Sequence, residues 1–387
     1  MFEKLIVTIL FVSTTNLYAQ KAISAVNMAS RYNPDSSPEI GFKWLNKSDL
    51  IITYISKSAF DKVSVAEYKS YRDKRSIREF TSESKCNGEQ CMVYFEIPEI
   101  KEGYVLILKM NRETDKSDYY YEVSTREEGL VPVMLKTGEG FPVLGSYVKA
   151  STTLMPEIVE GTGNEVHVYY YAKKFEFADP PTGIRRLPGK NLEADSVFTL
   201  KNREVFSPTA TGLYFMQSDT TVWEGLAFRV EDRAFPAYNS LEHLSECMRY
   251  ITTASEWKKL NVANLSKKEF DEVWLSMAGN ELGATNAIRE YFRRIKSSNR
   301  YFTTYKEGWK TDMGMIYTIF GPPEEVYIKR NYEIWKYGST VQHGRLEFSF
   351  QKSTIPFTNK QYVLMRDENY KLDWHRTIDL VRKGMDR

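Results

Sequence analysis

The chain has 387 residues, 42% of them hydrophobic, and its 53 basic and 51 acidic residues leave a formal net charge of +2. This length exceeds what one hydrophobic core normally serves, so we expect two to four domains. Neither sign of charge is gathered into a long block, which argues against nucleic acid as a partner.

The N-terminus predicts a secretory signal peptide over residues 1–19. Lys4 precedes an apolar core from Leu5 to Val12, and Ala19 ends a small-residue cleavage site before Gln20. The apolar run is shorter than the roughly 20 residues of a spanning helix; an uncleaved anchor is the alternative. No cysteine directly follows the cut and no later segment is long and apolar enough to span a bilayer. We therefore expect an exported protein with no lipid attachment there and no transmembrane segment after cleavage.

A first β-rich block from Glu39 to Thr125 predicts a β-sandwich domain within residues 20–126. Short strand-like segments such as EIGFKWL, DLIITYISK and GYVLILKMN are separated by turn residues. Several short strands at this spacing are typical of an immunoglobulin-like sandwich.

The cysteines of this block predict a disulfide. Cys86 and Cys91 flank Asn87-Gly88, a strong hairpin-turn pair, and export favours oxidation. Half of a zinc site is the alternative, but it needs a second pair of ligands with similar spacing, which the sequence lacks. Cys247 lies on an expected helix, where such a residue is usually a small buried hydrophobe.

A second β-rich block from Val131 to Asp232 predicts another sandwich within residues 127–235. Its strand-like segments include EVHVYYYAKKFEF, DSVFTLKNREVFS and GLYFMQSD. A single histidine in such a strand, here His167, is far more often packed or solvated than a ligand. Two sandwiches behind a signal peptide indicate binding or scaffolding, although carbohydrate-binding modules share this architecture.

The periodicity then changes to that of helices, and residues 236–387 form the last expected domain. Ser240 is placed to cap a helix, and Ser266 with Glu269 forms a capping box before a second. A third helix, ATNAIREYFRRIKSSNRYF, carries an apolar stripe, with Arg294 and its other basic residues expected largely on other faces.

From Tyr305 onward the pattern again favours strands. Met315 to Phe320 is a continuous apolar run that predicts a buried strand, and Gly321-Pro322-Pro323 ends it. YEIWKYG, GRLEFSFQK and QYVLMRD are three further strand-like segments. A compact antiparallel sheet with the preceding helix packed against it fits these lengths.

The sequence offers no recognisable catalytic constellation. It has no GxSxG, HExxH or glycine-rich phosphate loop, and its four histidines form no metal-binding spacing. Asp312 would need an acidic partner for general acid or base work, and the nearby Glu307, Glu324 and Glu325 also suit solvated turns. We expect no cofactor, no metal and no catalytic residue, and we favour turn chemistry over a ligand site for Gly308 to Asp312.

The stretch YFTTYKEGWKTDMGMIYTIFGPPEEVY, followed by YEIWKYG and LEFSFQK, resembles the GWxTD domain of exported proteins in Bacteroidetes and related bacteria. The resemblance covers roughly Leu260 to Trp374. It implies an envelope location and assigns no activity and no catalytic residues. The positions that carry it, and that we take as candidate binding residues, are Gly308, Trp309, Thr311, Asp312, Gly321, Pro322 and Trp335.

Together these features predict a mainly β protein with an α+β C-terminal part: two immunoglobulin-like sandwiches, a helical connector and a small antiparallel sheet domain. We expect a non-enzymatic component or adaptor of a larger envelope assembly, in the periplasm or at the outer membrane, with envelope proteins as partners. Glycan or peptidoglycan binding through exposed Tyr and Trp is the alternative, and a carboxylate-dependent glycan hydrolase using Asp312 is a further one.

Overall fold

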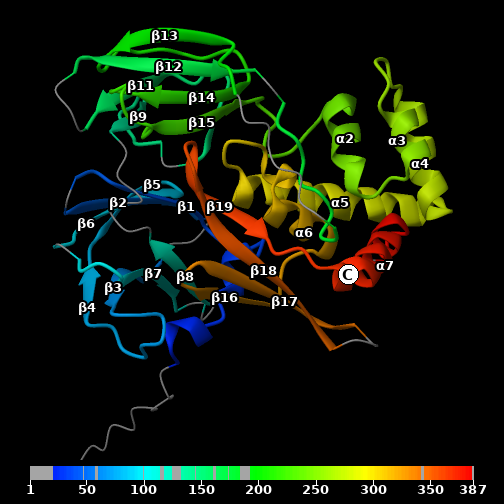
Figure 1. Cartoon of the computed structure of the whole chain (residues 1–387), viewed down its shortest axis with the longest axis horizontal. Helices are drawn as coiled ribbons and strands as arrows, with labels where there is room; N and C mark the ends of the chain where they lie inside the picture. The colour runs from blue at the N-terminus through cyan, green and yellow to red at the C-terminus, as the bar shows by residue number, and fades with distance from the viewer. Residues whose placement is uncertain are drawn as a thin grey trace, which may run out of the picture.

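In a computed structural model of the chain, the described residues are 21–46, 48–56, 60–98, 100–113, 117–123, 132–143, 145–159, 163–172, 174–183, 192–340 and 344–385. The expected signal peptide, the expected domain boundary at 126/127 and His343 lie outside these ranges. The described part is mainly β, with helices concentrated after residue 240, as expected (Figure 1).

Two four-stranded antiparallel sheets form the first sandwich. Their strands are β1 (Glu39–Trp44), β2 (Asp49–Ile55), β3 (Lys62–Tyr68), β4 (Arg78–Thr81), β5 (Ser84–Asn87), β6 (Gln90–Glu96), β7 (Val105–Arg112) and β8 (Ser117–Val123). The sheet orders, β1-β2-β6-β5 and β4-β3-β7-β8, follow the immunoglobulin arrangement with β4 as an added edge strand. Trp44, Ile52 and Val65 belong to the core between the sheets, because alternate residues of each strand face inward.

The β5–β6 hairpin carries the cysteine pair. Cys86 and Cys91 are directly opposite each other, and the structure joins them by a disulfide. Gly88 supplies the positive φ of +61° that the turn requires. Cys247 is free and buried.

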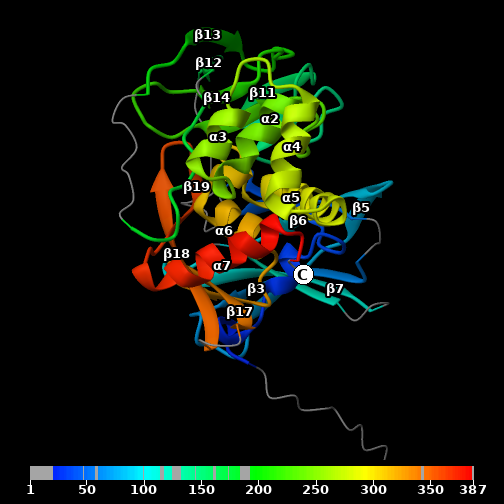
Figure 2. The same ribbon diagram turned by 90° about the vertical axis from the view of Figure 1, so that its right-hand side faces the viewer.

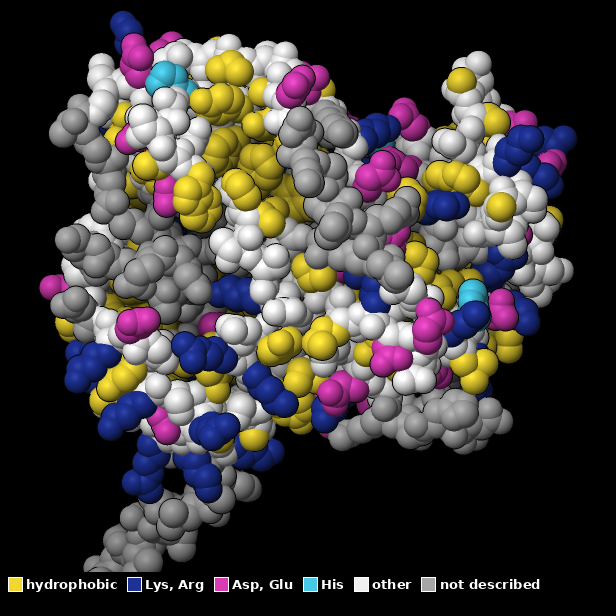
Figure 3. Space-filling model, viewed as in Figure 1, with side chains coloured by type: hydrophobic (Ala, Val, Ile, Leu, Met, Phe, Trp, Pro, Cys, Tyr) yellow, Lys and Arg dark blue, Asp and Glu magenta, His cyan; other side chains and the backbone are white. Residues whose placement is uncertain are grey.

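The second sandwich pairs a large sheet with a small one. Its strands are β9 (Val133–Thr137), β10 (Tyr147–Lys149), β11 (Leu154–Ile158), β12 (Glu165–Tyr171), β13 (Ser196–Lys201), β14 (Gly212–Gln217) and β15 (Leu226–Glu231). The order β10-β15-β14-β12-β13 makes a five-stranded sheet, in which β10 runs parallel to β15, and β11-β9 faces it. Figure 3 shows apolar side chains gathered over the outer face of the large sheet, where Phe357 packs against Tyr171 and Phe215.

The C-terminal part packs helices against a four-stranded antiparallel sheet (Figures 1 and 2). The helices are α2 (Leu241–Cys247), α3 (Ala254–Leu260), α4 (Lys267–Ala278), α5 (Glu281–Phe302), α6 (Asp312–Phe320) and α7 (Lys371–Arg382), with short 3₁₀ turns η3 (Met248–Tyr250), η4 (Gly308–Lys310) and η5 (Glu368–Tyr370). The sheet holds β16 (Glu325–Lys329), β17 (Tyr332–Thr340), β18 (Gly344–Ile355) and β19 (Thr358–Leu364) in sequential order. The predicted caps are confirmed: Ser240 accepts from the backbone of His243, and Ser266 forms a capping box with Glu269.

The prediction that Met315 to Phe320 forms a buried strand is wrong, because these residues belong to helix α6. Thr311 caps its N-terminus by accepting from the Gly314 N–H, and Gly321 ends it with a φ of +79°. Nearly every residue of the helix is buried, since it lies between α5 and the sheet. A helix that is buried on all sides has no polar face, so its sequence lacks the 3.6-residue alternation of polar and apolar residues. Its sequence therefore resembles that of a buried strand.

Arg294 is also placed differently from the prediction, because its side chain is only 2% exposed. It lies on the buried side of α5, where it donates to the Ile319 carbonyl at 2.8 Å and to the Glu290 carboxylate at 2.9 Å. These bonds satisfy a guanidinium inside the helical layer, which explains how a charge occupies that face.

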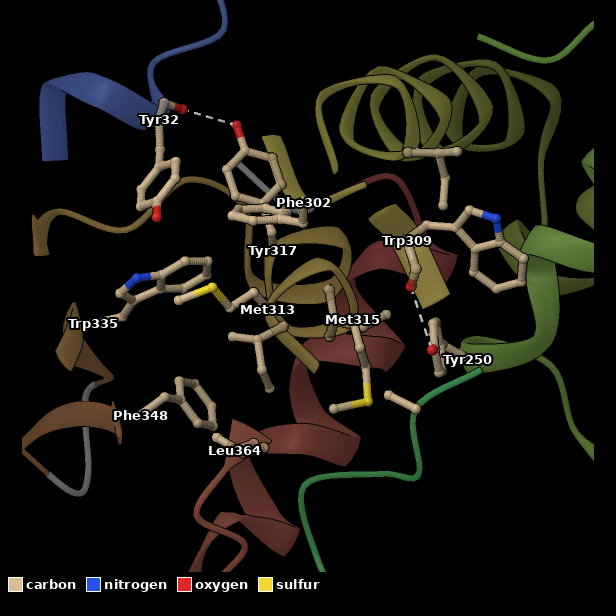
Figure 4. Close-up of a cluster of buried hydrophobic side chains, with 14 of the residues drawn as sticks. Tyr32, Tyr250, Phe302, Trp309, Met313, Met315, Tyr317, Trp335, Phe348 and Leu364 are labelled. Atoms are coloured by element: carbon tan, nitrogen blue, oxygen red, sulfur yellow. Dashed lines mark hydrogen bonds between the residues drawn. The ribbon is translucent and has the colours of Figure 1, made fainter. Parts of the chain in front are cut away.

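The residues before β1 pack against the C-terminal sheet. The Met28 N–H donates to the Val326 carbonyl at 2.8 Å, and the Tyr317 hydroxyl donates to the Tyr32 carbonyl at 3.0 Å. The Tyr32 ring lies 5.2 Å from that of Trp335 in the cluster of Figure 4. The expected sandwich range of 20–126 therefore begins with a segment that is held by the other end of the chain.

Glu333 anchors this segment with a carboxylate that is fully buried. It accepts from Arg31, from the Tyr32 hydroxyl at 2.6 Å and from the Trp335 indole at 2.7 Å. Three donors from two ends of the chain thus meet at one acceptor.

We expect Glu333→Ala to lower the free energy of unfolding by about 3–5 kcal/mol, because it leaves the buried Arg31 charge without its partner. Glu347→Ala on the next strand is the control: its ion pair with Lys336 is partly exposed to solvent, and its loss should cost less than about 1 kcal/mol. Urea unfolding of both variants measures the difference. Equal effects would contradict the anchoring role.

Candidate functional site

The two glycines at the candidate site bring three backbone segments into direct contact. A Cβ on Gly308 would lie 2.0 Å from the Ser298 carbonyl oxygen of α5. A Cβ on Gly314 would lie 1.8 Å from the Gly308 carbonyl oxygen. Neither oxygen can move aside without shifting the main chain. Gly308 therefore makes room for the backbone of α5.

Trp309 is buried, with 1% of its surface exposed. Its backbone N–H donates to the Asn299 side-chain oxygen at 3.2 Å. Its indole ring packs edge-on against the Tyr250 ring, with 5.9 Å between the ring centroids. The Tyr250 hydroxyl donates to the Trp309 carbonyl at 3.4 Å (Figure 4). A ligand on the surface cannot stack on this indole.

Thr311 and Asp312 connect α6 to its surroundings. The Thr311 hydroxyl accepts from the Gly314 N–H at 3.0 Å and donates to the Gly308 carbonyl at 2.7 Å. The Asp312 carboxylate accepts from the Leu364 N–H at 2.9 Å and from the Arg366 guanidinium at 2.8 Å. Asp312 thereby ties the start of α6 to the end of β19.

Arg366 extends this connection to the segment that follows β12. Besides Asp312, it donates to the carbonyls of Asp179 at 2.9 Å and Pro180 at 3.1 Å. The Ala178 N–H donates to the Lys310 carbonyl at 2.9 Å. The second sandwich is therefore fastened to the motif through its 178–180 segment.

Lys310, the variable position of the motif, sits in a buried charge network. Its ammonium lies 2.9 Å from the Glu246 carboxylate and 3.3 Å from that of Glu307. Glu307 in turn lies 3.2 Å from Arg229 of β15, which also pairs with Glu231. The network joins η4, α2 and the second sandwich, and no sequence spacing could have revealed it because its members are far apart in the chain.

Burial and charge shift two carboxyl groups of this network in opposite directions. Burial raises the pKa of Glu231 to about 7, although Arg229 acts to lower it. Burial also acts to raise the pKa of Glu307, but attraction from Arg229 and Lys310 outweighs it and the pKa is lowered. Glu307 thus stays ionised between two cations, while Glu231 titrates near neutral pH.

Glu307, Lys310, Asp312 and Arg366, which connect the motif to other elements, form a hub. The other candidate residues lie apart from it. Trp335 is fully buried on the opposite side of α6 from Trp309, with Met313 and Met315 between the two rings (Figure 4). Gly321 ends α6, and its carbonyl accepts from the Tyr337 hydroxyl at 3.0 Å. Pro322 alone among the candidate positions is exposed. The expectation that these residues bind a partner stays a prediction.

A groove of about 1570 Å³ lies where the two sandwiches meet the C-terminal part. Both sandwiches and the C-terminal part contribute aromatic rings to its lining, among them Phe42, Tyr121, Phe141, Tyr147, Tyr301 and Phe357. Asp312 and Arg366 also line it, so the hub forms part of its wall.

Polar side chains of the groove wall hold unused hydrogen-bonding capacity. Within the described part of the chain, the Tyr121 hydroxyl, Thr137 Oγ1 and Thr304 Oγ1 are buried without a hydrogen-bond partner, and all three residues line the groove. Buried polar atoms are normally satisfied.

The described residues contain no group of three or more His, Cys, Asp or Glu side chains that could hold a metal ion. In the same ranges, no helix is long and apolar enough to cross a membrane.

The carboxylates of Asp312 and Glu307 are both engaged within the chain. Asp312 is engaged by Arg366 and the Leu364 N–H, whereas Glu307 is engaged by Lys310 and Arg229. Asp312 is thus paired with one cation and Glu307 with two.

Residues 212–383 match the family model of the GWxTD domain. This range includes β14 and β15 of the second sandwich, so the entire charge network lies within it. No curated protein matches the chain. The chain is similar to a solved chimeric titin Z1Z2 functionalized with a KLER exogenous peptide from decorin, at 11% identity and a TM-score of 0.15, over 51% of this chain and 95% of that chain. A likeness this weak supports no inference about the protein.

We expect Gly308→Ala and Gly314→Ala each to lower the free energy of unfolding by more than about 2 kcal/mol, because the added methyl groups overlap main-chain oxygens. The matched control is Gly145→Ala, whose Cβ would be 3.8 Å from its nearest neighbour. Thermal unfolding monitored by circular dichroism measures all three. Stable folding of Gly314→Ala would show that α6 and η4 are not held in close contact.

The raised pKa of Glu231 predicts a pH dependence of stability. Its folded value of about 7 exceeds the ordinary 4.5, so its contribution to the free energy of unfolding is greatest below about pH 4.5 and is lost as the pH rises through 7. We expect wild type to lose up to about 3 kcal/mol relative to Glu231→Gln across this interval. Urea titrations of both proteins at several pH values measure it; a difference independent of pH would refute the assignment.

Proposed function

We propose that this protein, which belongs to the GWxTD domain-containing family, is a non-enzymatic interaction protein of the cell envelope that binds an envelope protein in the groove between its domains. The observation that carries the proposal is that the polar groups of the motif are committed to contacts within the chain. The motif builds the wall of a groove instead of presenting reactive groups.

The hub supports this role because it fixes the positions of separate structural units. Asp312 and Arg366 connect α6, β19 and the segment after β12, while Lys310 and Glu307 connect α2 to β15. A groove whose walls come from different units is useful for binding only if the units are held rigidly. Removing the hub would separate the walls.

The groove itself supports binding by its position and lining. Ligand sites occur preferentially between domains and combine aromatic walls with a few polar groups. Aromatic side chains also contribute strongly to protein interfaces because they bury much area with little loss of rotamer entropy. Half-buried Phe141 and Tyr147 of the second sandwich and exposed Ile55 of the first line the same space.

The envelope location is supported by the predicted signal peptide and by the disulfide between Cys86 and Cys91, since disulfides form and persist in oxidising compartments. A role as a component or adaptor of a periplasmic or outer-membrane assembly follows from that location together with the groove. Both parts of this role depend on export of the chain.

The two alternative functions receive less support from the geometry. Of the four rings whose exposure would favour glycan stacking, Trp309 and Trp335 are buried and Tyr171 is 7% exposed, so among these four only half-buried Tyr169 reaches the surface. A hydrolase using Asp312 would need that carboxylate within reach of a substrate, and its oxygens are engaged by the Arg366 guanidinium and the Leu364 N–H.

Envelope crosslinking followed by affinity purification tests the proposal. We expect wild type to recover a reproducible envelope protein, and Ile55→Asp or Phe141→Asp to lose it, because each places a charge on the apolar groove wall. The matched control is Ile77→Asp: Ile77 is 45% exposed, close to the 43% of Ile55, and lies outside the groove lining.

Circular dichroism confirms that each variant is folded before the purifications are compared. Recovery of the same partner by wild type and both groove variants would overturn the groove as the binding site. Recovery of no reproducible partner by wild type would overturn the interaction role itself.

A further inference from the structure

In the described part of the chain, the charge network between the second sandwich and the C-terminal part holds one carboxylate more than it has cations. At its buried centre, the guanidinium of Arg229 contacts two carboxylates, that of Glu231 and, at 3.2 Å, that of Glu307. From Glu307 the ion pairs continue through Lys310 and α2 to Lys174. Ion pairs thus join four carboxylates to three cations: Glu231, Glu242, Glu246 and Glu307 to Lys174, Arg229 and Lys310.

The same network is short of a hydrogen-bond donor. Glu307 Oε2 is buried without a hydrogen-bond partner among the described residues, although the other oxygen of this carboxylate contacts both Arg229 and Lys310. Buried acceptors are normally satisfied. One added proton removes the charge excess and the repulsion between two carboxylates on one guanidinium. Burial raises the pKa of Glu231 to about 7, which makes Glu231 the group that takes this proton.

The groups that face Glu231 come from every element packed around it. Arg229 lies beside it on β15, and the register of β10 places Lys149 opposite it. The Lys149 ammonium donates to the Arg233 carbonyl at 2.8 Å and to the Phe235 carbonyl. The remaining groups are Tyr147 of β10, Tyr238 before α2, and Glu307 and Lys310 of η4. Burial raises the pKa of both tyrosine hydroxyls, so neither titrates near neutral pH.

The network lies directly behind one wall of the groove. Lys149, which is opposite Glu231, lines the groove. Arg229 donates to the carbonyl of Tyr305 at 3.1 Å, and Tyr305 also lines the groove. A change in the ion pairs of Arg229 therefore acts where the second sandwich meets the 303–306 segment.

We propose that this network is a proton-controlled clasp: with a proton on the Glu231 carboxyl it holds the second sandwich against the C-terminal part, and release of that proton to solvent loosens the contact. The ionised form leaves an excess negative charge in a buried site, and opening lets water solvate that charge. The effect of opening on a partner in the groove rests on the proposed function, whereas the opening itself needs no partner.

Proton linkage makes opening more favourable as the pH rises. In the closed state Glu231 loses its proton near pH 7, whereas in the open, solvated state it does so near the ordinary 4.5. The closed state is therefore favoured below pH 7 and loses this advantage as the pH rises through 7. Between pH 6 and pH 8 the ratio of open to closed molecules should increase roughly tenfold.

Hydrogen exchange followed by mass spectrometry tests the clasp in the full chain. The Ala178 N–H donates to the Lys310 carbonyl at 2.9 Å across the junction, so it exchanges when the clasp opens. After correction for the intrinsic pH dependence of exchange, we expect its protection in wild type to fall roughly tenfold from pH 6 to pH 8. In Glu231→Gln, whose side chain is neutral at both pH values, we expect equal protection.

Low concentrations of urea separate this opening from global unfolding. Protection that is lost only through global unfolding falls steeply with urea, because unfolding exposes much surface. Local opening exposes little surface, so the protection of Ala178 should fall less steeply than that of β3 in the first sandwich.

Two matched variants separate Glu231 from other titratable groups. Glu157→Gln removes another ion-paired carboxylate of the second sandwich and should keep the tenfold fall of wild type. His243→Gln tests the histidine of α2, which lies 4.0 Å from Asp232, because histidine side chains titrate near neutral pH. We expect this variant to keep the fall as well.

Protection of Ala178 that is independent of pH in wild type would overturn the clasp, and so would loss of the pH response in His243→Gln. A urea dependence of Ala178 as steep as that of β3 would assign its exchange to global unfolding and overturn the clasp too. Should Glu231→Gln fail to fold, the fall must still appear in both wild type and His243→Gln. None of these measurements uses a partner, so their outcome is independent of whether the groove binds one.

Discussion

The structure depends on one steric constraint: three backbone segments cross without any side chain between them. Gly308 rests on α5 at Ser298, and Gly314 rests on Gly308. This contact fixes η4 and the start of α6 against the longest helix of the chain. The Trp309 ring, the Thr311 cap and the Asp312 carboxylate take their positions from it, because all three lie within one turn of the crossing.

The charges around this crossing convert a local contact into a connection between domains. Asp312 reaches β19 and, through Arg366, the segment after β12. Lys310 and Glu307 reach β15 through Arg229. Such buried ion pairs contribute little net stability compared with apolar packing, but breaking one is costly, so they specify a single arrangement of the units. That arrangement defines the groove.

The groove is the surface that follows from this arrangement of the units. It combines aromatic walls with buried side-chain groups that have no hydrogen-bond partner among the described residues, which suits a partner held by its side chains.

The sequence by itself determined the two sandwiches, the capped helices and the cysteine pair, because strand alternation, capping boxes and hairpin turns are local patterns. It failed at α6, whose residues are apolar on every side and carry no period, and at Arg294, whose carbonyl partner lies on another helix. Only the tertiary structure placed Trp309 and Trp335 in the interior and brought Arg229 to Glu307. Burial and ion pairing between distant segments depend on how the elements pack, and no spacing along the chain encodes that packing.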